Sequence, residues 1–250
     1  MIEFLIEYLL NENPRYSGIA VPTAEKERFR LYRSLVNIRP AIPADEKYLK
    51  AEDEFLSELT LSRGITDIAE LEPIEDNIYL WQGDITTLKC GAIVNAANSG
   101  MTGCYQPCHS CIDNCIHTFA GVRLRLECAG IMEKQGFEEP TGQAKITSAY
   151  NLPCDYIIHT VGPIVNGELT DVHCRLLKSC YNSCLELAVK NNLDSIAFCC
   201  ISTGVFGFPK QEAAEIAVKT VRDFLKRNRI KVVFNVFGDD DYEIYKRLLG

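Results

Sequence analysis

The sequence has 250 residues, 47% of them hydrophobic and 24% charged, and its formal net charge at pH 7 is −8. This composition is typical of a folded globular protein, and an acidic balance argues against the basic surface that general binding to nucleic-acid backbones requires. No run approaches the roughly 18 apolar residues that span a bilayer. Residues 1–10 are apolar but contain two glutamates and no basic residue, so they lack the n-region of a signal peptide. We therefore expect a cytoplasmic protein with no nucleic-acid and no membrane partner, whose twelve cysteines are reduced thiols or metal ligands.

The first part of the chain differs in composition from the remainder. Residues 1–75 hold 9 Lys/Arg against 15 Asp/Glu, a net charge of −6, and no cysteine. Apolar residues recur there with helical spacing over 3–10, 25–37 and 44–64, and strand-like alternation is absent. We expect residues 1–75 to form an α-helical N-terminal extension and residues 76–250 to form a second domain.

Short apolar segments alternate with helical patterns from residue 76 onward. The apolar segments are rich in β-branched and aromatic residues, as strands buried on both faces are. We expect strands at residues 78–82, 92–95, 156–161, 195–200 and 231–237, and helices at residues 112–130, 171–192, 210–229 and 240–249. This alternation predicts an α/β fold with three layers, α/β/α, around a mostly parallel mixed sheet. Ligands bind such sheets beyond the carboxyl ends of the strands.

A cysteine-rich loop precedes the first of these helices and carries Cys104, His109 and Cys111. Three soft or borderline ligands match a catalytic zinc site, which leaves a fourth position for water or substrate, whereas structural zinc normally has four protein ligands. Cys108 adjoins His109, and the backbone hinders both side chains from reaching one ion. A disulfide, a closed structural zinc that uses Cys108 or Cys115, and a set of buried thiols remain open on spacing alone.

Other polar residues stand at strand ends or beside the loop. Residues 200–209, Cys-Ile-Ser-Thr-Gly-Val-Phe-Gly-Phe-Pro, connect a strand to a helix, and their backbone N–H groups can approach a diphosphate closely, although such a turn is as often a tight connection. Asp84 follows an earlier strand and either accepts a hydrogen bond from an exocyclic amine or caps the next helix, the commoner role. Asp113 lies two residues beyond Cys111 and is placed to act beside a metal. We interpret His117 and His159 as packed core residues.

The order of these motifs resembles the macrodomain family over residues ~76–250. The motifs are Gly-Asp-Ile-Thr at 83–86, Ala-Ile-Val-Asn-Ala-Ala-Asn at 92–98, Ile-Asp-Asn-Cys-Ile-His at 112–117, Thr-Gly-Gln-Ala at 141–144, Ile-His-Thr-Val-Gly-Pro at 158–163, and the Gly-containing segment at 201–209. Residues 103–111 replace the usual glycine run of that family with the Cys/His loop. The chain therefore resembles the zinc-dependent branch of macrodomains, whose members also carry a helical N-terminal extension.

The resemblance implies a hydrolase that removes mono-ADP-ribose from a modified protein. The residues that would bind ADP-ribose are Asp84 and Ile85 at the adenine, Phe237 stacked on it, Ser202, Thr203, Gly204, Val205 and Phe206 around the diphosphate, and Asn98 and Asp113 at the distal ribose. Asn98 and Asp113 would be the catalytic residues, and Cys104, His109 and Cys111 would hold one zinc ion per chain. The branch further implies a bacterial system in which a sirtuin-type ADP-ribosyltransferase is the counterpart of this enzyme and a lipoyl-carrier protein of the glycine-cleavage type is its substrate.

The chemistry of such a site follows from the bond that is cut. Cleavage at the anomeric carbon of the distal ribose builds positive charge on the ring and negative charge on the leaving group. Zinc can polarise a substrate oxygen or lower the pKa of a bound water toward about 7, while Asp113 orients or deprotonates the water. We expect an ester to an acidic side chain as the preferred linkage, because its carbonyl oxygen can face the metal. Two other functions remain open: a module that reads ADP-ribose around a structural zinc, and a hydrolase of a free ADP-ribose derivative.

Overall fold

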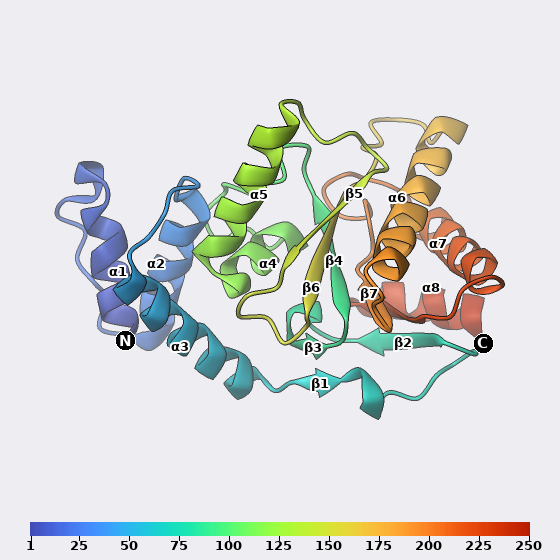
Figure 1. Cartoon of the computed structure of the whole chain (residues 1–250), viewed down its shortest axis with the longest axis horizontal. Helices are drawn as coiled ribbons and strands as arrows, with labels where there is room; N and C mark the ends of the chain where they lie inside the picture. Colours follow the sequence, from blue (N-terminus) through green and yellow to red (C-terminus); the bar gives the residue numbers. More distant parts are fainter.

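The computed structural model describes residues 1–250, and its second part is a sheet between two layers of helices (Figure 1). The six strands lie in the order β2-β8-β7-β4-β6-β5 and are all parallel except for the antiparallel pair of β5 and β6. Their bounds are Ile78–Gln82 (β2), Ala92–Ala97 (β4), Ala144–Ser148 (β5), Tyr156–Val161 (β6), Ser195–Phe198 (β7) and Lys231–Val236 (β8). The predicted α/β fold with a mostly parallel mixed sheet is confirmed. Strand β5 escaped prediction because it is an edge strand in which Thr147 alone is buried.

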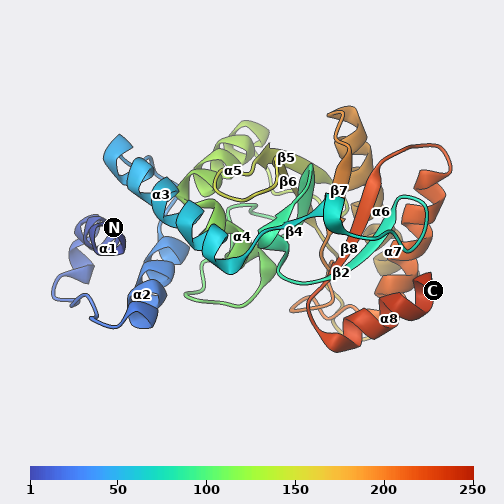
Figure 2. The same cartoon turned by 90° about the horizontal axis from the view of Figure 1, so that it is seen from below.

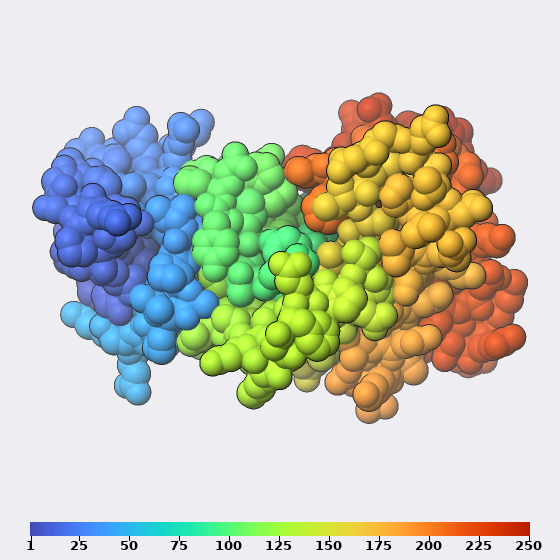
Figure 3. All heavy atoms as spheres, turned by 90° about the horizontal axis from the view of Figure 1, so that it is seen from above, coloured from blue at the N-terminus to red at the C-terminus, as the bar shows by residue number.

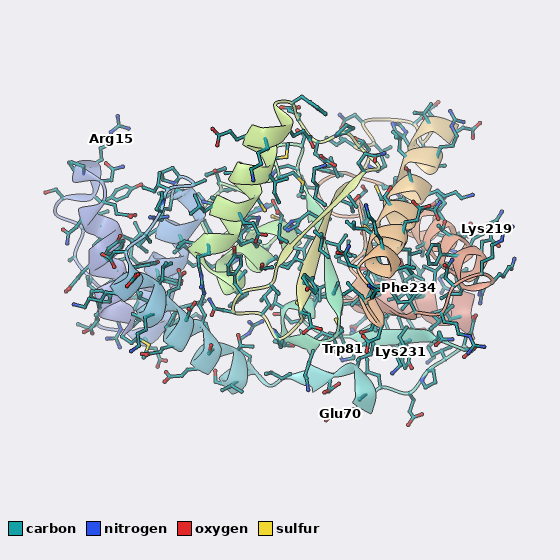
Figure 4. The ribbon with its side chains drawn as sticks, viewed as in Figure 1. Arg15, Glu70, Trp81, Lys219, Lys231 and Phe234 are labelled. Atoms are coloured by element: carbon teal, nitrogen blue, oxygen red, sulfur yellow. The ribbon has the colours of Figure 1, made fainter.

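Helices cover both faces of the sheet. Three of them, α6 (Asp171–Lys190), α7 (Lys210–Leu225) and α8 (Asp239–Leu249), pack side by side over one face (Figure 1). Phe234 of β8, labelled in Figure 4, joins this layer to the sheet, since its ring centroid lies 5.0 Å from that of Tyr245 in α8. The other face is covered by α4 (Ile112–Ala120) and α5 (Val122–Gln135). Burial of the strands between these layers creates the main core of 44 buried residues.

The expectation of one helix over residues 112–130 is wrong, because the chain breaks at Gly121 into α4 and α5. Gly121 has φ +95°, a value that favours glycine, and a Cβ atom there would lie 2.7 Å from Oε2 of Glu52. The same Glu52 oxygen accepts a hydrogen bond from the backbone N–H of Val122 at 3.0 Å. A carboxylate from a distant helix therefore caps the start of α5.

The N-terminal residues form a lobe at one end of the molecule (Figures 2 and 3). Strand β1 (Thr66–Asp67) and the 3-10 turn η2 (Ile68–Glu70) lie outside this lobe: β1 runs beside β3 (Leu88–Lys89; Figure 1), and Ile68 belongs to the main core. The lobe itself contains α1 (Ile2–Asn11), α2 (Glu25–Ile38), α3 (Glu46–Arg63) and the 3-10 turn η1 (Pro14–Tyr16). Nine buried side chains form a separate core here, eight from α1–α3 and one, Val122, from α5. The three predicted helices are present. The two-residue strand β1, which the sequence pattern did not indicate, pairs in parallel with β3. A domain boundary at residue 75 stays a prediction.

None of the helices combines the length and apolar composition needed to cross a bilayer.

Candidate active site

Several predicted site residues lie at one edge of the sheet. Asp84 follows β2, Asn98 follows β4, Ser202 follows β7 and Phe237 follows β8, and these four strands run parallel. Their carboxyl ends therefore open on the same side, where ligands of such sheets bind. The α4 segment that bears Asp113 packs against β4 at this edge.

Asp84 is held by two different parts of the chain. Its Oδ1 accepts hydrogen bonds from the backbone N–H of Thr86 at 2.9 Å and from the Thr86 hydroxyl at 2.6 Å, so Asp84 caps the 3-10 turn η3 (Ile85–Thr87). Its Oδ2 forms an ion pair with Arg63 at the end of α3. The neighbouring Ile85 is buried, whereas the Phe237 ring is 80% exposed and therefore free to stack on a ligand.

The loop between β7 and α7 presents unpaired donors. None of the backbone N–H groups of Gly204, Val205 and Phe206 donates a hydrogen bond to another group of the chain. The hydroxyl of Ser202 is buried without a partner, and Ser202 itself adopts φ +65°. A Cβ atom on Gly204 would meet no atom within 4 Å, so this glycine faces open space. Such a set of free N–H groups after a strand is suited to an anion, as a diphosphate is.

Asp113 lies in the first turn of α4 and is almost completely buried. Its Oδ1 accepts a hydrogen bond from Nδ2 of Asn95 at 2.8 Å, and its Oδ2 accepts one from Nδ2 of Asn98 at 3.2 Å. Burial raises the pKa of Asp113 to about 6, while the two amides and the charge of Arg125 act in the opposite direction. Two amide donors therefore fix the orientation of the Asp113 carboxylate. Its pKa lies closer to neutral pH than that of an ordinary aspartate, as suits a general base.

Asn95 was not identified from the sequence. It is fully buried in β4, and its Nδ2 donates both to Asp113 and to Nδ1 of His159 at 3.0 Å. The available signal was a polar residue inside an otherwise apolar strand, which requires buried partners. His159 completes the chain of contacts through Nε2, which lies 2.8 Å from the hydroxyl of Thr147. The interpretation of His159 as a hydrogen-bonded core residue is confirmed.

His117 lies one helical turn beyond Asp113, with 3.6 Å between its Nε2 and Oδ1 of Asp113. Its two ring nitrogens are buried without hydrogen-bond partners, and burial lowers the pKa of His117 well below its usual value. His117, Cys128 and His159 bring ligand atoms within 4.8 Å of one another. His159 already uses both ring nitrogens in hydrogen bonds, so this trio is better described as a packed polar cluster beneath Asp113 than as a metal centre.

The predicted metal ligands do converge. Ligand atoms of Cys104, His109 and Cys111 lie within 4.8 Å of one another, and Sγ of Cys104 is 3.7 Å from Nδ1 of His109. Two thiols and one imidazole at this spacing fit a zinc ion with an open fourth position. Cys108 is directed elsewhere, since its Sγ lies 3.1 Å from the hydroxyl of Ser34 in α2. Cys115 is likewise outside the group, with its Sγ 3.4 Å from a guanidinium nitrogen of Arg33.

Comparison with known proteins places this geometry in a family. The family model described as Macro domain matches residues 94–217. A protein from Treponema medium named protein-ADP-ribose hydrolase is 59% identical over 99% of this chain and 97% of its own length. A protein of the same name from Staphylococcus aureus (strain MSSA476) is 52% identical over 96% of this chain and 93% of its own length.

A solved structure agrees with these relatives. The Trypanosoma brucei macrodomain in complex with ADP-ribose has a TM-score of 0.66 and is 34% identical, covering 87% of this chain and 95% of that one. The expectation of a hydrolase agrees with the names of the two bacterial relatives, each of which is similar to this chain over nearly its whole length. The chain belongs to the Macro domain family.

Proposed function

We propose that this protein is a zinc-dependent hydrolase that removes mono-ADP-ribose from a modified protein. The observation that carries the proposal is the position of Asp113, a buried carboxylate with a raised pKa, between a Cys/His loop and a sheet edge with free backbone donors. The names of relatives at 52% and 59% identity and the ADP-ribose in a related structure support the choice of substrate.

The residues of this chain divide the work by position. The N–H groups of Gly204, Val205 and Phe206 would hold the diphosphate, while the exposed Phe237 ring would stack on the adenine. Asp84 and Ile85 would bound the adenine end, and Ser202 and Thr203 would complete the diphosphate loop. This arrangement would direct the distal ribose toward Asn98 and Asp113.

Asp113 would act on the water that attacks the anomeric carbon. Asn95 and Asn98 hold its two oxygens, so the carboxylate would orient the water and accept its proton without moving. Zinc, when bound by Cys104, His109 and Cys111, would supply Lewis acidity toward an oxygen of the substrate or of water.

The finer parts of the proposal follow from the resemblance to zinc-dependent macrodomains. We propose an ester to an acidic side chain as the linkage, a lipoyl-carrier protein of the glycine-cleavage type as the modified protein, and a sirtuin-type ADP-ribosyltransferase as the enzyme that modifies it. The site of action would be the bacterial cytoplasm. A reaction with purified carrier protein, modified on glutamate or aspartate, tests linkage and partner together.

The experiment that tests the function separates binding from turnover. Gly204→Glu places a charged side chain in the open space beside the free donors and should abolish ADP-ribose binding measured by calorimetry. Asp113→Ala should keep binding and lose turnover by about 10²-fold or more, the typical contribution of a general base. Metal-free protein should stay folded and bind ADP-ribose without releasing it from the carrier.

Three outcomes would contradict parts of this proposal. Binding without turnover in the wild-type protein would identify a reader of ADP-ribose. Faster turnover of a free ADP-ribose derivative than of modified protein would replace the substrate class. Full hydrolysis by metal-free protein would remove zinc from the reaction.

A further inference from the structure

The Cys/His loop has little structure of its own. Residues 104–111 belong to no helix or strand, and the one backbone hydrogen bond within them runs from the N–H of His109 to the carbonyl of Gln106 at 3.3 Å. A loop this poor in internal hydrogen bonds does not hold three ligands at a fixed spacing unaided. Its geometry must therefore depend on the groups packed around it.

Arg33 of α2 makes the first set of outside contacts. One guanidinium nitrogen, Nη2, donates to the carbonyl of His109 at 2.7 Å and to Oδ1 of Asn114 at 3.0 Å. The Asn114 amide is thereby oriented, and its Nδ2 donates to the carbonyls of Cys104 at 3.3 Å and Gln106 at 2.9 Å. A single side chain from the N-terminal lobe is thus linked, directly or through Asn114, to the backbone of two of the three metal-ligand residues.

Asn37 and Ser34, on the same helix, make the second set. Oδ1 of Asn37 accepts a hydrogen bond from the backbone N–H of Cys108 at 2.9 Å, and its Nδ2 donates to the hydroxyl of Thr118 in α4 at 2.9 Å. Cys108 adopts φ +54°, an uncommon conformation for a residue with a side chain, immediately before His109. Its thiol lies against Ser34 of α2. Cys108 is therefore attached to the helix, and the left-handed turn that aims His109 is held by Asn37.

We propose that helix α2 positions the metal-binding loop, with Arg33 and Asn37 as the positioning residues and Cys108 as the point of attachment. The inference rests on the zinc site of the proposed function, but it concerns how the loop is held and not what the ion does. Groups that hold metal ligands in place typically contribute 10- to 100-fold to metal affinity. The N-terminal extension is in this view a part of the metal site.

The test compares substitutions on one helix in the full-length protein. Arg33→Met removes the donating guanidinium and keeps most of the aliphatic side chain. Arg33→Lys is the conservative variant: its ammonium group carries three donors on one nitrogen, and in the wild-type protein Nη2 of Arg33 alone makes the contacts. Arg30→Met is the matched control, because the Arg30 side chain is exposed and makes no hydrogen bond or ion pair, and its backbone carbonyl, which contacts Sγ of Cys108 at 3.4 Å, is kept by the substitution. Asn37→Leu removes the second set of contacts at similar volume.

Zinc affinity can be measured by competition with a chromophoric chelator. It should fall by about 10- to 100-fold in Arg33→Met and in Asn37→Leu. Arg33→Lys should restore the affinity, and Arg30→Met should leave it unchanged. ADP-ribose affinity should stay within about threefold of the wild-type value in all four variants, since the adenine and diphosphate groups lie at other strand ends. Zinc affinity within threefold of wild type in both Arg33→Met and Asn37→Leu would overturn the inference.

A second measurement does not require the metal. In metal-free protein, alkylation of Cys104 and Cys111 by iodoacetamide, followed by mass spectrometry, should be several-fold faster in Arg33→Met than in Arg30→Met. Equal rates would also overturn the inference. A wild-type protein that binds no zinc would instead refute the metal part of the proposed function, while the alkylation rates would still decide whether α2 holds the loop. If Asn37→Leu fails to fold, Arg33→Met carries both measurements.

Discussion

Glu52 connects the N-terminal lobe to the rest of the protein, and its replacement by alanine should destabilise the whole chain. The side chain is fully buried in α3. Its Oε1 accepts hydrogen bonds from the hydroxyls of Tyr32 and Tyr48, both at 2.9 Å, and its Oε2 accepts one from the backbone N–H of Val122 at 3.0 Å. Glu52→Ala leaves all three donors buried without an acceptor.

The size of the effect follows from that number of donors. A buried donor that loses its partner costs about 1–3 kcal/mol, and Glu52→Ala leaves three such donors, two hydroxyls and one backbone N–H. We therefore expect a loss of about 3–5 kcal/mol in the free energy of unfolding. A chain of this length loses roughly 2–4 °C of melting temperature per kcal/mol, so the transition should fall by about 6–20 °C.

The pH dependence has a defined sign. Burial is the main reason that the pKa of Glu52 is raised above its usual value, so the folded protein binds more protons than the unfolded chain between the two pKa values. The contribution of Glu52 to stability is thus complete below the unfolded value of about 4.5 and decreases as the pH rises through the folded pKa. The deficit of Glu52→Ala should be largest at acidic pH.

Urea denaturation followed by circular dichroism measures the difference. Asp53→Ala is the matched control, because the neighbouring Asp53 pairs with Arg123 across the same junction but both side chains are about one-third exposed. That substitution should change stability by less than about 1 kcal/mol. A Glu52→Ala protein as stable as Asp53→Ala would refute the view that the carboxylate joins the lobe to α5.

Three further predictions concern the metal loop, the helix break and the adenine end. Cys108→Ser should retain one zinc per chain by elemental analysis, whereas Cys111→Ser should lose it, because the thiol of Cys108 faces α2; the reverse result would mean that the ligand assignment is wrong. Gly121→Ala should destabilise the protein by more than the roughly 1–3 kcal/mol of backbone strain at φ +95° and ψ 174°, because its Cβ would also approach Glu52. Gly130→Ala, in open space on α5, should be neutral or stabilising, and equal melting temperatures for the two variants would contradict this. Phe237→Ala should weaken ADP-ribose binding by about 1–3 kcal/mol without changing the melting temperature, since the ring is exposed, and calorimetry with unchanged affinity would exclude stacking.

The layers of the fold were readable from the sequence because they depend on local periodicity. Buried parallel strands are short apolar runs and their flanking helices repeat every 3.6 residues, so β2, β4, β6, β7 and β8 were all predicted close to their observed bounds. The three candidate zinc ligands were also readable, because they lie within eight residues of one another and a loop of that length keeps them close. Which residues contact ADP-ribose stays a proposal.

Tertiary structure alone decided the contacts between distant parts of the chain. The helix predicted over residues 112–130 is interrupted at Gly121, and the carboxylate that lies beside this glycine and caps α5 comes from Glu52 in another lobe, a neighbour that no local pattern encodes. Asn95 holds Asp113 across 18 positions of sequence, and Arg33 reaches His109 across 76. Periodicity and spacing report which face a residue occupies and how near its sequence neighbours are, whereas the partner of a buried polar group is set by the packing of whole elements.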